Sequence, residues 1–264
     1  MANALIGFSG FVGSTLLKQA PFDFLYRSTN IRDIEGKSYD TVVCAGAPAQ
    51  KWIANREPEA DRQKIVDLIA HLNTIHCNTL ILISTVDVFK ESTGANEETP
   101  VDETGLHAYG LNRRLLEKFV EQHFTNHLIV RLPGLVGPRL RKNVIFDFLN
   151  DNNLHAIDSR GIFQFYPMVN LWCDIQLALS AGLKLVHLTA EPISVADISA
   201  KIFGRPFVQV QTNSPTTYDF RTLHAEIFGT TGHYQYSRRE TIQAIRAYAQ
   251  SEPITIKATE GKNA

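Results

Sequence analysis

The chain has 264 residues, of which 44% are hydrophobic, so it is long enough to bury a substantial core. Its formal net charge of -1 and isoelectric point of about 6.8 give no bias toward polyanions, which argues against nucleic acid as a partner. Strand signals begin by Ala4, which leaves no room for a signal peptide, and no apolar run approaches the ~18 residues that a membrane span needs. We therefore expect a cytoplasmic protein with no membrane partner.

The spacing of apolar residues predicts strands and helices in alternation along most of the chain. The sequence therefore predicts an α/β fold, a doubly wound parallel sheet. Strands are predicted at residues 4–8, 23–27, 40–45, 79–84, 127–132 and 184–189, and helices at 11–19, 59–76, 107–124, 170–182, 195–203, 218–228 and 238–250.

The first predicted strand runs into a glycine-rich turn with the spacing G-x-x-G-x-x-G, and an amphipathic segment follows. Glycine lets a backbone approach a pyrophosphate closely, and the first amides of the following helix offer hydrogen-bond donors to an anion. A plain tight turn at the start of a strand-helix unit is the alternative. The candidate cofactor-binding residues in this turn are Gly7, Ser9, Gly10, Phe11, Val12 and Gly13.

Two later strands end in features that belong at a ligand crevice. The apolar run at 79–84 turns polar at Ser84 and Thr85, and the strand at 127–132 ends sharply at Pro133. Side chains at the carboxyl ends of parallel strands face the ligand crevice of such sheets.

Tyr109 and Arg113 stand four residues apart at the start of a predicted helix, so both side chains leave the same face. A phenol with a pKa of about 10 is a poor proton carrier at neutral pH. A cation at about 4 Å is worth roughly 4 kcal/mol at an effective dielectric of 20, which lowers the pKa of the phenol by roughly three units. Tyr109 is then a general acid and base, provided that desolvation does not cancel the effect. Spacing alone is also compatible with a purely structural pair.

Together these residues resemble the extended short-chain dehydrogenase/reductase family, the NAD-dependent epimerase/dehydratase proteins. In that family a Ser or Thr lies about two dozen residues before the Tyr of a Y-x-x-x-K motif. Here Thr85 precedes Tyr109 by 24 residues and stands four before Phe89, where the strand exit of the family falls. We therefore prefer Thr85 to Ser84 as the hydroxyl that faces the substrate. The resemblance also implies that Pro133 lies beside the nicotinamide.

The resemblance implies further cofactor contacts. Ala45, Gly46 and Ala47 resemble the loop under the adenosine side of the cofactor. At the end of the second strand, NAD-preferring members carry an acid, whereas this chain has Arg27 and Ser28. A guanidinium beside a hydroxyl suits a 2′-phosphate, so NADP is slightly favoured over NAD. Arg27 as an ordinary exposed loop residue is the alternative, and Asp33 or Glu35 could still reach a ribose.

The departure from the family is at position 113, where arginine replaces the lysine of the motif. Arginine is longer, planar and permanently charged, so the exchange is not conservative. Two outcomes are expected. Either Arg113 reaches the cofactor ribose and keeps its field at Tyr109, or it turns to solvent and leaves a cofactor-binding protein with little catalysis.

The resemblance implies a small substrate-binding lobe, whose candidate substrate contacts are Arg141, Asn143 and Tyr166, with Ser84 from the sheet. In the dehydratases of the family an acid and a further base near that threonine assist elimination. Here Val86 separates Thr85 from Asp87, so the resemblance argues against dehydration and leaves epimerisation or carbonyl reduction. The expected organisation is a Rossmann core at 1–135 and 168–190, a small lobe at 136–167 and 191–256, and a tail at 257–264.

The functional hypothesis is an NAD(P)-dependent oxidoreductase or epimerase that acts on a sugar-like alcohol or ketone, nucleotide sugars included. The competing hypothesis is an NAD(P)-binding sensor or scaffold with little or no catalysis. A homodimer through the helices at 59–76 and 107–124 is compatible with either and rests on the resemblance alone. No metal site is expected, because the only H-x-x-x-H pair, His123 and His127, lacks the glutamate of a zinc protease.

Overall fold

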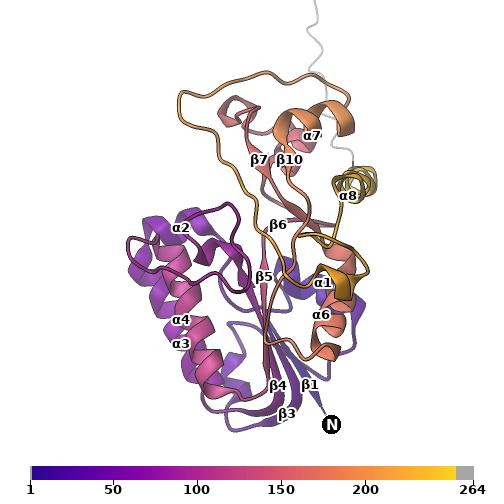
Figure 1. The fold of residues 1–264 in the computed structure, drawn as a ribbon. Coiled ribbons are helices and arrows are strands. Elements are labelled where there is room, and N and C mark those ends of the chain that lie inside the picture. The colour runs from indigo at the N-terminus through magenta and orange to yellow at the C-terminus, as the bar shows by residue number, and fades with distance from the viewer. Residues whose placement is uncertain (1, 254–264) are drawn as a thin grey trace, which may run out of the picture.

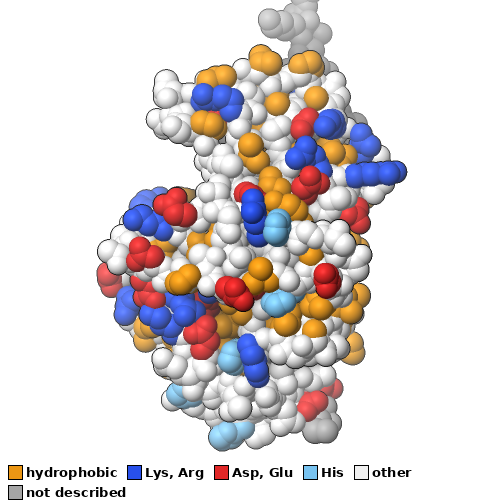
Figure 2. Space-filling view, viewed as in Figure 1, with side chains coloured by type: hydrophobic (Ala, Val, Ile, Leu, Met, Phe, Trp, Pro, Cys, Tyr) orange, Lys and Arg blue, Asp and Glu red, His pale blue; other side chains and the backbone are white. Residues whose placement is uncertain are grey.

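The computed structural model describes residues 2–253, which form a helix-covered sheet and a smaller lobe beyond one end of it (Figure 1). The predicted tail at 257–264 and the last three residues of the predicted lobe, 254–256, lie outside the described residues. On the face that Figure 2 shows, acidic and basic side chains are interspersed, and the outline narrows between the lobe and the sheet. No helix within residues 2–253 combines the length and the apolar character needed to cross a membrane.

The central sheet has six strands, and every pairing between them is parallel. In spatial order they are β2 (Phe24–Tyr26), β1 (Asn3–Ile6), β3 (Ser38–Cys44), β4 (His76–Thr85), β5 (His127–Leu132) and β9 (Leu185–His187). Each matches a predicted strand, which confirms the parallel sheet. β2 pairs with one edge of β1, and β3 pairs with the other edge. The direction in which strands are added to the sheet therefore reverses between β1 and β3. Ligands of open α/β sheets bind at such a switch point, outside the carboxyl ends of the strands.

Helices cover both faces of the sheet, which confirms the doubly wound arrangement. On one side lie α1 (Phe11–Gln19) and α6 (Leu171–Ser180), and on the other α3 (Pro58–Leu72) and α4 (Ala108–His123) (Figure 1). Because neighbouring residues of a strand point to opposite faces, Leu5 joins the apolar core under α1 and α6, whereas Ala4 joins the core under α3 and α4. The helix predicted at 59–76 ends earlier, because β4 already begins at His76.

The lobe is built from short strands and three helices around its own core (Figure 1). Phe148, Ile198 and Ile245 are fully or almost fully buried there. The lobe contains the parallel pair β6 (Gly134–Val136) and β8 (Phe165–Pro167), the antiparallel pair β7 (Ile162–Phe163) and β10 (Ile193–Ser194), and the helices α5 (Val144–Asn150), α7 (Val195–Ile202) and α8 (Arg238–Ser251).

The helix predicted at 218–228 is wrong. Only a short 3-10 turn forms, at Ala225–Phe228, and the preceding residues are not helical. The amide of Phe220 donates to the buried Gln164 side chain at 2.7 Å, and Asp219 forms a bridge with Thr93. These long-range contacts satisfy the backbone groups that a helix would have paired locally. The sequence also missed the six-residue helix α2 (Lys51–Arg56).

A buried ion network fastens α4 to the sheet. Glu117, on α4, is 0% exposed and accepts hydrogen bonds from both Nε and Nη2 of Arg131 on β5, at 2.9 and 2.7 Å. It also accepts from the Ser84 hydroxyl at 2.6 Å and from Arg114 at 3.0 Å. Burial raises the pKa of Glu117, but these donors outweigh it, and its pKa lies below the ordinary value.

We predict that Glu117→Gln lowers the free energy of unfolding at neutral pH by about 1.5–3 kcal/mol, because Arg131 loses its charged partner. A carboxyl whose folded-state pKa is depressed contributes stability above its unfolded pKa of about 4.3, and this contribution is lost as the pH falls through the folded value. The difference between the two proteins in urea unfolding should therefore shrink in acid. An equal difference at neutral and acidic pH would contradict the electrostatic role.

Candidate active site

The switch point brings together two of the predicted cofactor loops. Gly7 follows β1 and Ala45 follows β3, and the amide of Ala45 donates to the carbonyl of Ile6 at 2.9 Å. Gly7 has φ +83°, and a Cβ placed on it would lie 2.3 Å from the Ala45 carbonyl oxygen. Only glycine fits this contact, so the two loops form one continuous surface at the carboxyl ends of β1 and β3.

The glycine turn leaves its backbone accessible at the start of α1. A Cβ on Gly13 would lie 2.1 Å from the Gly7 carbonyl oxygen, so the first helical turn packs directly on the loop. A Cβ on Gly10 would meet only that oxygen, at 3.4 Å, an ordinary contact. Gly10 is exposed and caps α1 without a side chain. Open backbone at a helix N-terminus fits the approach of a dinucleotide pyrophosphate. Of the other turn residues, Ser9 is exposed, and Phe11 and Val12 are half-buried.

The candidate adenosine side lies next to this turn. Arg27 and Ser28 are exposed directly after β2, and the Arg27 guanidinium lies 5.8 Å from the centre of the Phe8 ring in the glycine loop. The Nε of Arg27 donates to the Thr29 hydroxyl at 3.0 Å. The Glu35 carboxylate, the alternative ribose ligand, is 2.8 Å from Nδ1 of His71.

Tyr109 is the second residue of α4 and is 8% exposed. His107 caps this helix, because its Nδ1 accepts from the amide of Gly110 at 3.0 Å. The amide of Tyr109 donates to the Asn55 side chain on α2 at 2.9 Å. A Cβ on Gly110 would lie 2.5 Å from the Asp87 carbonyl oxygen, so the start of α4 packs tightly on the turn that follows β4. That packing brings Tyr109 to the carboxyl end of β4.

The two hydroxyls at the end of β4 have different surroundings. Thr85 is 9% exposed, and its hydroxyl oxygen accepts from the amide of Asp87 at 3.1 Å. Ser84, on the opposite face of the strand, donates to Glu117. Ser84 therefore belongs to the buried ion network. The preference for Thr85 as the substrate-facing hydroxyl stays a prediction.

Arg113 does not turn to solvent, whereas its contact with a cofactor ribose stays a prediction. It is 3% exposed, and its guanidinium donates hydrogen bonds to both carboxylate oxygens of Asp61 on α3, at 2.5 and 3.0 Å. It also donates to the carbonyl of Pro48. Its Cζ lies 4.2 Å from the centre of the Tyr109 ring. The guanidinium is therefore a fixed, buried and paired cation against the face of the phenol.

The pKa of Tyr109 is raised above its ordinary value, contrary to the expected lowering. Burial of the phenol is the largest cause. Arg113 lowers the pKa, and the Asp87 carboxylate adds to the effect of burial. Two features of the fold explain the difference: the ring is buried, which is the desolvation that could cancel the effect, and Asp61 accompanies the cation with an opposite charge.

No family model matches the sequence, and no curated protein matches it. Solved structures do match. The *Bordetella bronchiseptica* enzyme WbmG in complex with NAD has a TM-score of 0.72 at 16% identity over 96% of each chain. A dTDP-4-dehydrorhamnose reductase from *Yersinia enterocolitica* has a TM-score of 0.69 at 15% identity over 95% of this chain and 99% of that one. RMD from *Pseudomonas aeruginosa* with NADPH has a TM-score of 0.67 at 17% identity over 95% and 99%. The chain has the extended short-chain dehydrogenase/reductase fold.

Within this dehydrogenase/reductase fold, two of the predicted substrate residues have structural roles. Tyr166 is 0% exposed and donates its hydroxyl to Asp174 at 2.5 Å, away from solvent. Asn143, at φ +96°, caps α5 and donates to the carbonyl of Leu135 at 2.9 Å. Arg141 is exposed on the loop before α5. Tyr166 belongs to the apolar core that the sheet shares with α1 and α6, and Asp174 lies on α6.

Sequence reasoning missed a polar cluster at the mouth of the site. Lys51, the first residue of α2, forms an ion pair with Asp87 at 2.6 Å. The Tyr218 hydroxyl, from the lobe, lies 3.4 Å from the same carboxylate oxygen. Lys142 donates to the carbonyl of Ala49. The only signal in the sequence was the place of Asp87, two residues after Thr85.

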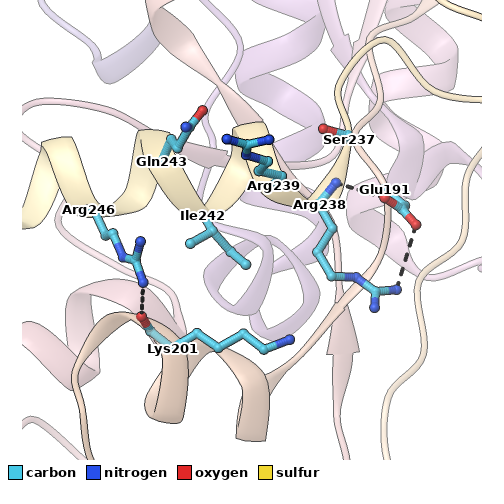
Figure 3. A pocket seen from close by; sticks show the side chains of 8 residues that line it. All are labelled: Glu191, Lys201, Ser237, Arg238, Arg239, Ile242, Gln243 and Arg246. Atoms are coloured by element: carbon cyan, nitrogen blue, oxygen red, sulfur yellow. Dashed lines mark hydrogen bonds and ion pairs between the residues drawn. The ribbon is translucent and has the colours of Figure 1, made fainter.

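A cavity of about 630 Å³ lies apart from the crevice, between α7 and α8 of the dehydrogenase/reductase fold (Figure 3). Three of its cations have partners: Arg238 lies 3.8 Å from Glu191, Arg246 donates to the carbonyl of Lys201 at 2.6 Å, and Lys201 pairs with Asp197 at 3.0 Å. It is lined by Glu191, Lys201, Ser237, Arg238, Arg239, Ile242, Gln243 and Arg246. Among residues 2–253, no group of three or more His, Cys, Asp or Glu side chains is placed to hold a metal ion.

Proposed function

We propose that this protein is an oxidoreductase or epimerase that uses a nicotinamide dinucleotide and acts on a sugar-like alcohol or ketone. The observation that carries the proposal is the packing of Gly110 against Asp87, which holds Tyr109 at the end of the strand that carries Thr85. The glycine turn lies at the switch point of the same sheet edge. The similar solved structures include a UDP-galactose 4-epimerase and a dTDP-4-dehydrorhamnose reductase, which supports nucleotide-linked sugars as the first substrates to test.

The chemistry divides between the cofactor and the chain. A nicotinamide dinucleotide, when bound, would supply the hydride transfer at the substrate carbon. Tyr109 then gives or takes the proton of the substrate oxygen, and the Thr85 hydroxyl orients that oxygen. Arg113 fixes the Tyr109 ring from its face, and its charge opposes part of the effect of burial. Pro133, which follows β5, would border the nicotinamide side.

The cofactor would lie along the switch point. The glycine turn from Gly7 to Gly13 would hold the pyrophosphate, and the loop from Ala45 to Ala47 the adenosine side. NADP remains slightly favoured, because Arg27 and Ser28 are exposed beside the glycine loop, where a guanidinium and a hydroxyl suit a 2′-phosphate.

A second function, an NAD(P)-binding sensor with little catalysis, is favoured by one observation. Arg113 is committed to Asp61 and the pKa of Tyr109 is raised, so the phenol lacks the free ammonium of the family motif. A fluorescence titration with NADPH and NADH, followed by a screen of nucleotide sugars for oxidation, reduction and epimerised product, separates the two. Cofactor binding without turnover on any substrate supports the sensor, and no cofactor binding contradicts both.

We predict that Gly10→Ala weakens cofactor binding about tenfold or more, equivalent to about 1.4 kcal/mol. The added methyl meets no chain atom closer than 3.4 Å, so the protein should fold normally while the methyl obstructs the approach of the pyrophosphate. Gly182→Ala is the matched control. Gly182 has φ +71° in the turn after α6, so this change should lower the melting temperature and leave the dissociation constant unchanged. Unaltered affinity in Gly10→Ala would place the cofactor elsewhere.

A further inference from the structure

We propose that Lys51 and Asp87 form a charge pair that tunes Tyr109 from outside α4, with the Lys51 ammonium adding to the field of Arg113 and the Asp87 carboxylate opposing it. The catalytic consequence rests on the proposed function, whereas the electrostatic claim does not. Both residues are positioning residues, because they act through Tyr109.

The helix α2 presents Lys51 to the start of α4. Lys51 and Asn55 stand four residues apart on α2, so they share one face of it. Asn55 accepts a hydrogen bond from the amide of Tyr109 at 2.9 Å, which shows that this face adjoins Tyr109. Lys51 therefore stands one helical turn from Asn55, which contacts the Tyr109 backbone directly.

Asp87 approaches the same place from the sheet. Its amide donates to the Thr85 hydroxyl, and its carbonyl oxygen packs against Gly110, next to Tyr109. Its carboxylate holds the Lys51 ammonium at 2.6 Å. The ion pair thus stands at the junction of the two residues to which the proposed reaction assigns proton transfer and orientation.

The two cations near Tyr109 differ in freedom. Arg113 is 3% exposed and held by both oxygens of Asp61. The side chains of Lys51 and Asp87 are 37% and 21% exposed, and the ion pair joins the Lys51 ammonium to one oxygen of Asp87. Solvent can therefore reach both side chains. The other titratable groups facing this pair are His107 at the start of α4, the Tyr218 hydroxyl at 3.4 Å from Asp87, and Lys142, whose charge interacts with Asp87.

The charges of the pair act on the phenol with opposite signs. After burial and Arg113, Asp87 raises the pKa of Tyr109 and Lys51 lowers it. Lys51→Met should therefore raise the pKa of Tyr109 and Asp87→Asn should lower it, each by about half to one unit, the size expected for a partly screened neighbouring charge. In the double variant the two shifts should largely cancel. Lys51→Arg keeps the charge and should restore the parent pKa.

The test is a carbon NMR titration of the full-length protein with tyrosine labelled at Cζ, in which the Tyr109 signal is assigned by its loss in Tyr109→Phe. Opposed shifts that cancel in the double variant, with rescue by Lys51→Arg, support the inference. Shifts of the same sign, or no shift in either single variant, overturn it. Because the titration needs no substrate, opposed shifts without any turnover would contradict the proposed function and leave the pair established. If Lys51→Met does not fold, Lys51→Gln and Asp87→Asn carry the same comparison.

Discussion

Replacing Tyr109 with phenylalanine is expected to lower turnover by about 10²–10⁴-fold, the usual contribution of a positioned acid and base. The fold should survive, because a phenylalanine ring keeps the face that Arg113 covers at 4.2 Å. Cofactor affinity should stay close to that of the parent, since the glycine turn follows β1, whereas Tyr109 lies at the end of β4. Steady-state rates with the best substrate of the screen, together with a cofactor titration of the same variant, provide the measurement.

Tyr166→Phe is the matched control for Tyr109→Phe. It also removes one buried phenolic hydroxyl, but that hydroxyl bonds to Asp174 in the core, so stability should fall and turnover should be nearly unchanged. A Tyr109→Phe variant that turns over as fast as the parent would remove Tyr109 from the mechanism. An equal loss in both tyrosine variants would point to a general loss of folded protein.

The sheet and its covering helices followed from the sequence because their signals are local. Apolar runs and helical spacing placed β4 and α3 within a few residues of their observed ends. The six-residue α2 was missed because it is too short to show a helical period. The segment from Tyr218 was wrongly predicted as helix because its conformation depends on Gln164, more than fifty residues earlier in the chain.

The candidate site was predictable in position but not in electrostatics. The interval between Tyr109 and Arg113 on a helix does place the cation on the ring, at 4.2 Å. It contains no information about Asp61, which pairs with Arg113 from another helix. Burial is likewise a property of the packed fold, and it decides both the raised pKa of Tyr109 and the core position of Tyr166. The local motif therefore predicts where Tyr109 and Arg113 lie, whereas residues distant in the sequence determine the pKa of Tyr109 and the pairing of Arg113.

Asp61→Ala is expected to lower the free energy of unfolding by about 3–5 kcal/mol, because it leaves the Arg113 charge buried without its partner. Asp61 also accepts from Asn112 at 2.9 Å, so a second buried donor loses its acceptor. Urea unfolding followed by circular dichroism measures the change. The control is Asp197→Ala, which breaks the exposed pair with Lys201 at 3.0 Å and should cost at most about 0.5 kcal/mol after solvent screening.

Two further variants separate charge from packing at this pair. Asp61→Leu combined with Arg113→Met removes both charges and should recover much of the stability lost in Asp61→Ala. Arg113→Lys should be destabilising, since a single ammonium cannot span both Asp61 oxygens and also reach the carbonyl of Pro48. A lysine that preserves stability and also raises turnover would instead mean that the arginine is an impaired form of the family motif. An Arg113→Lys variant that is less stable and no faster would mean that the pair of Arg113 and Asp61 serves mainly to hold α3 and α4 together. The electrostatic field at Tyr109 would then depend on other charges.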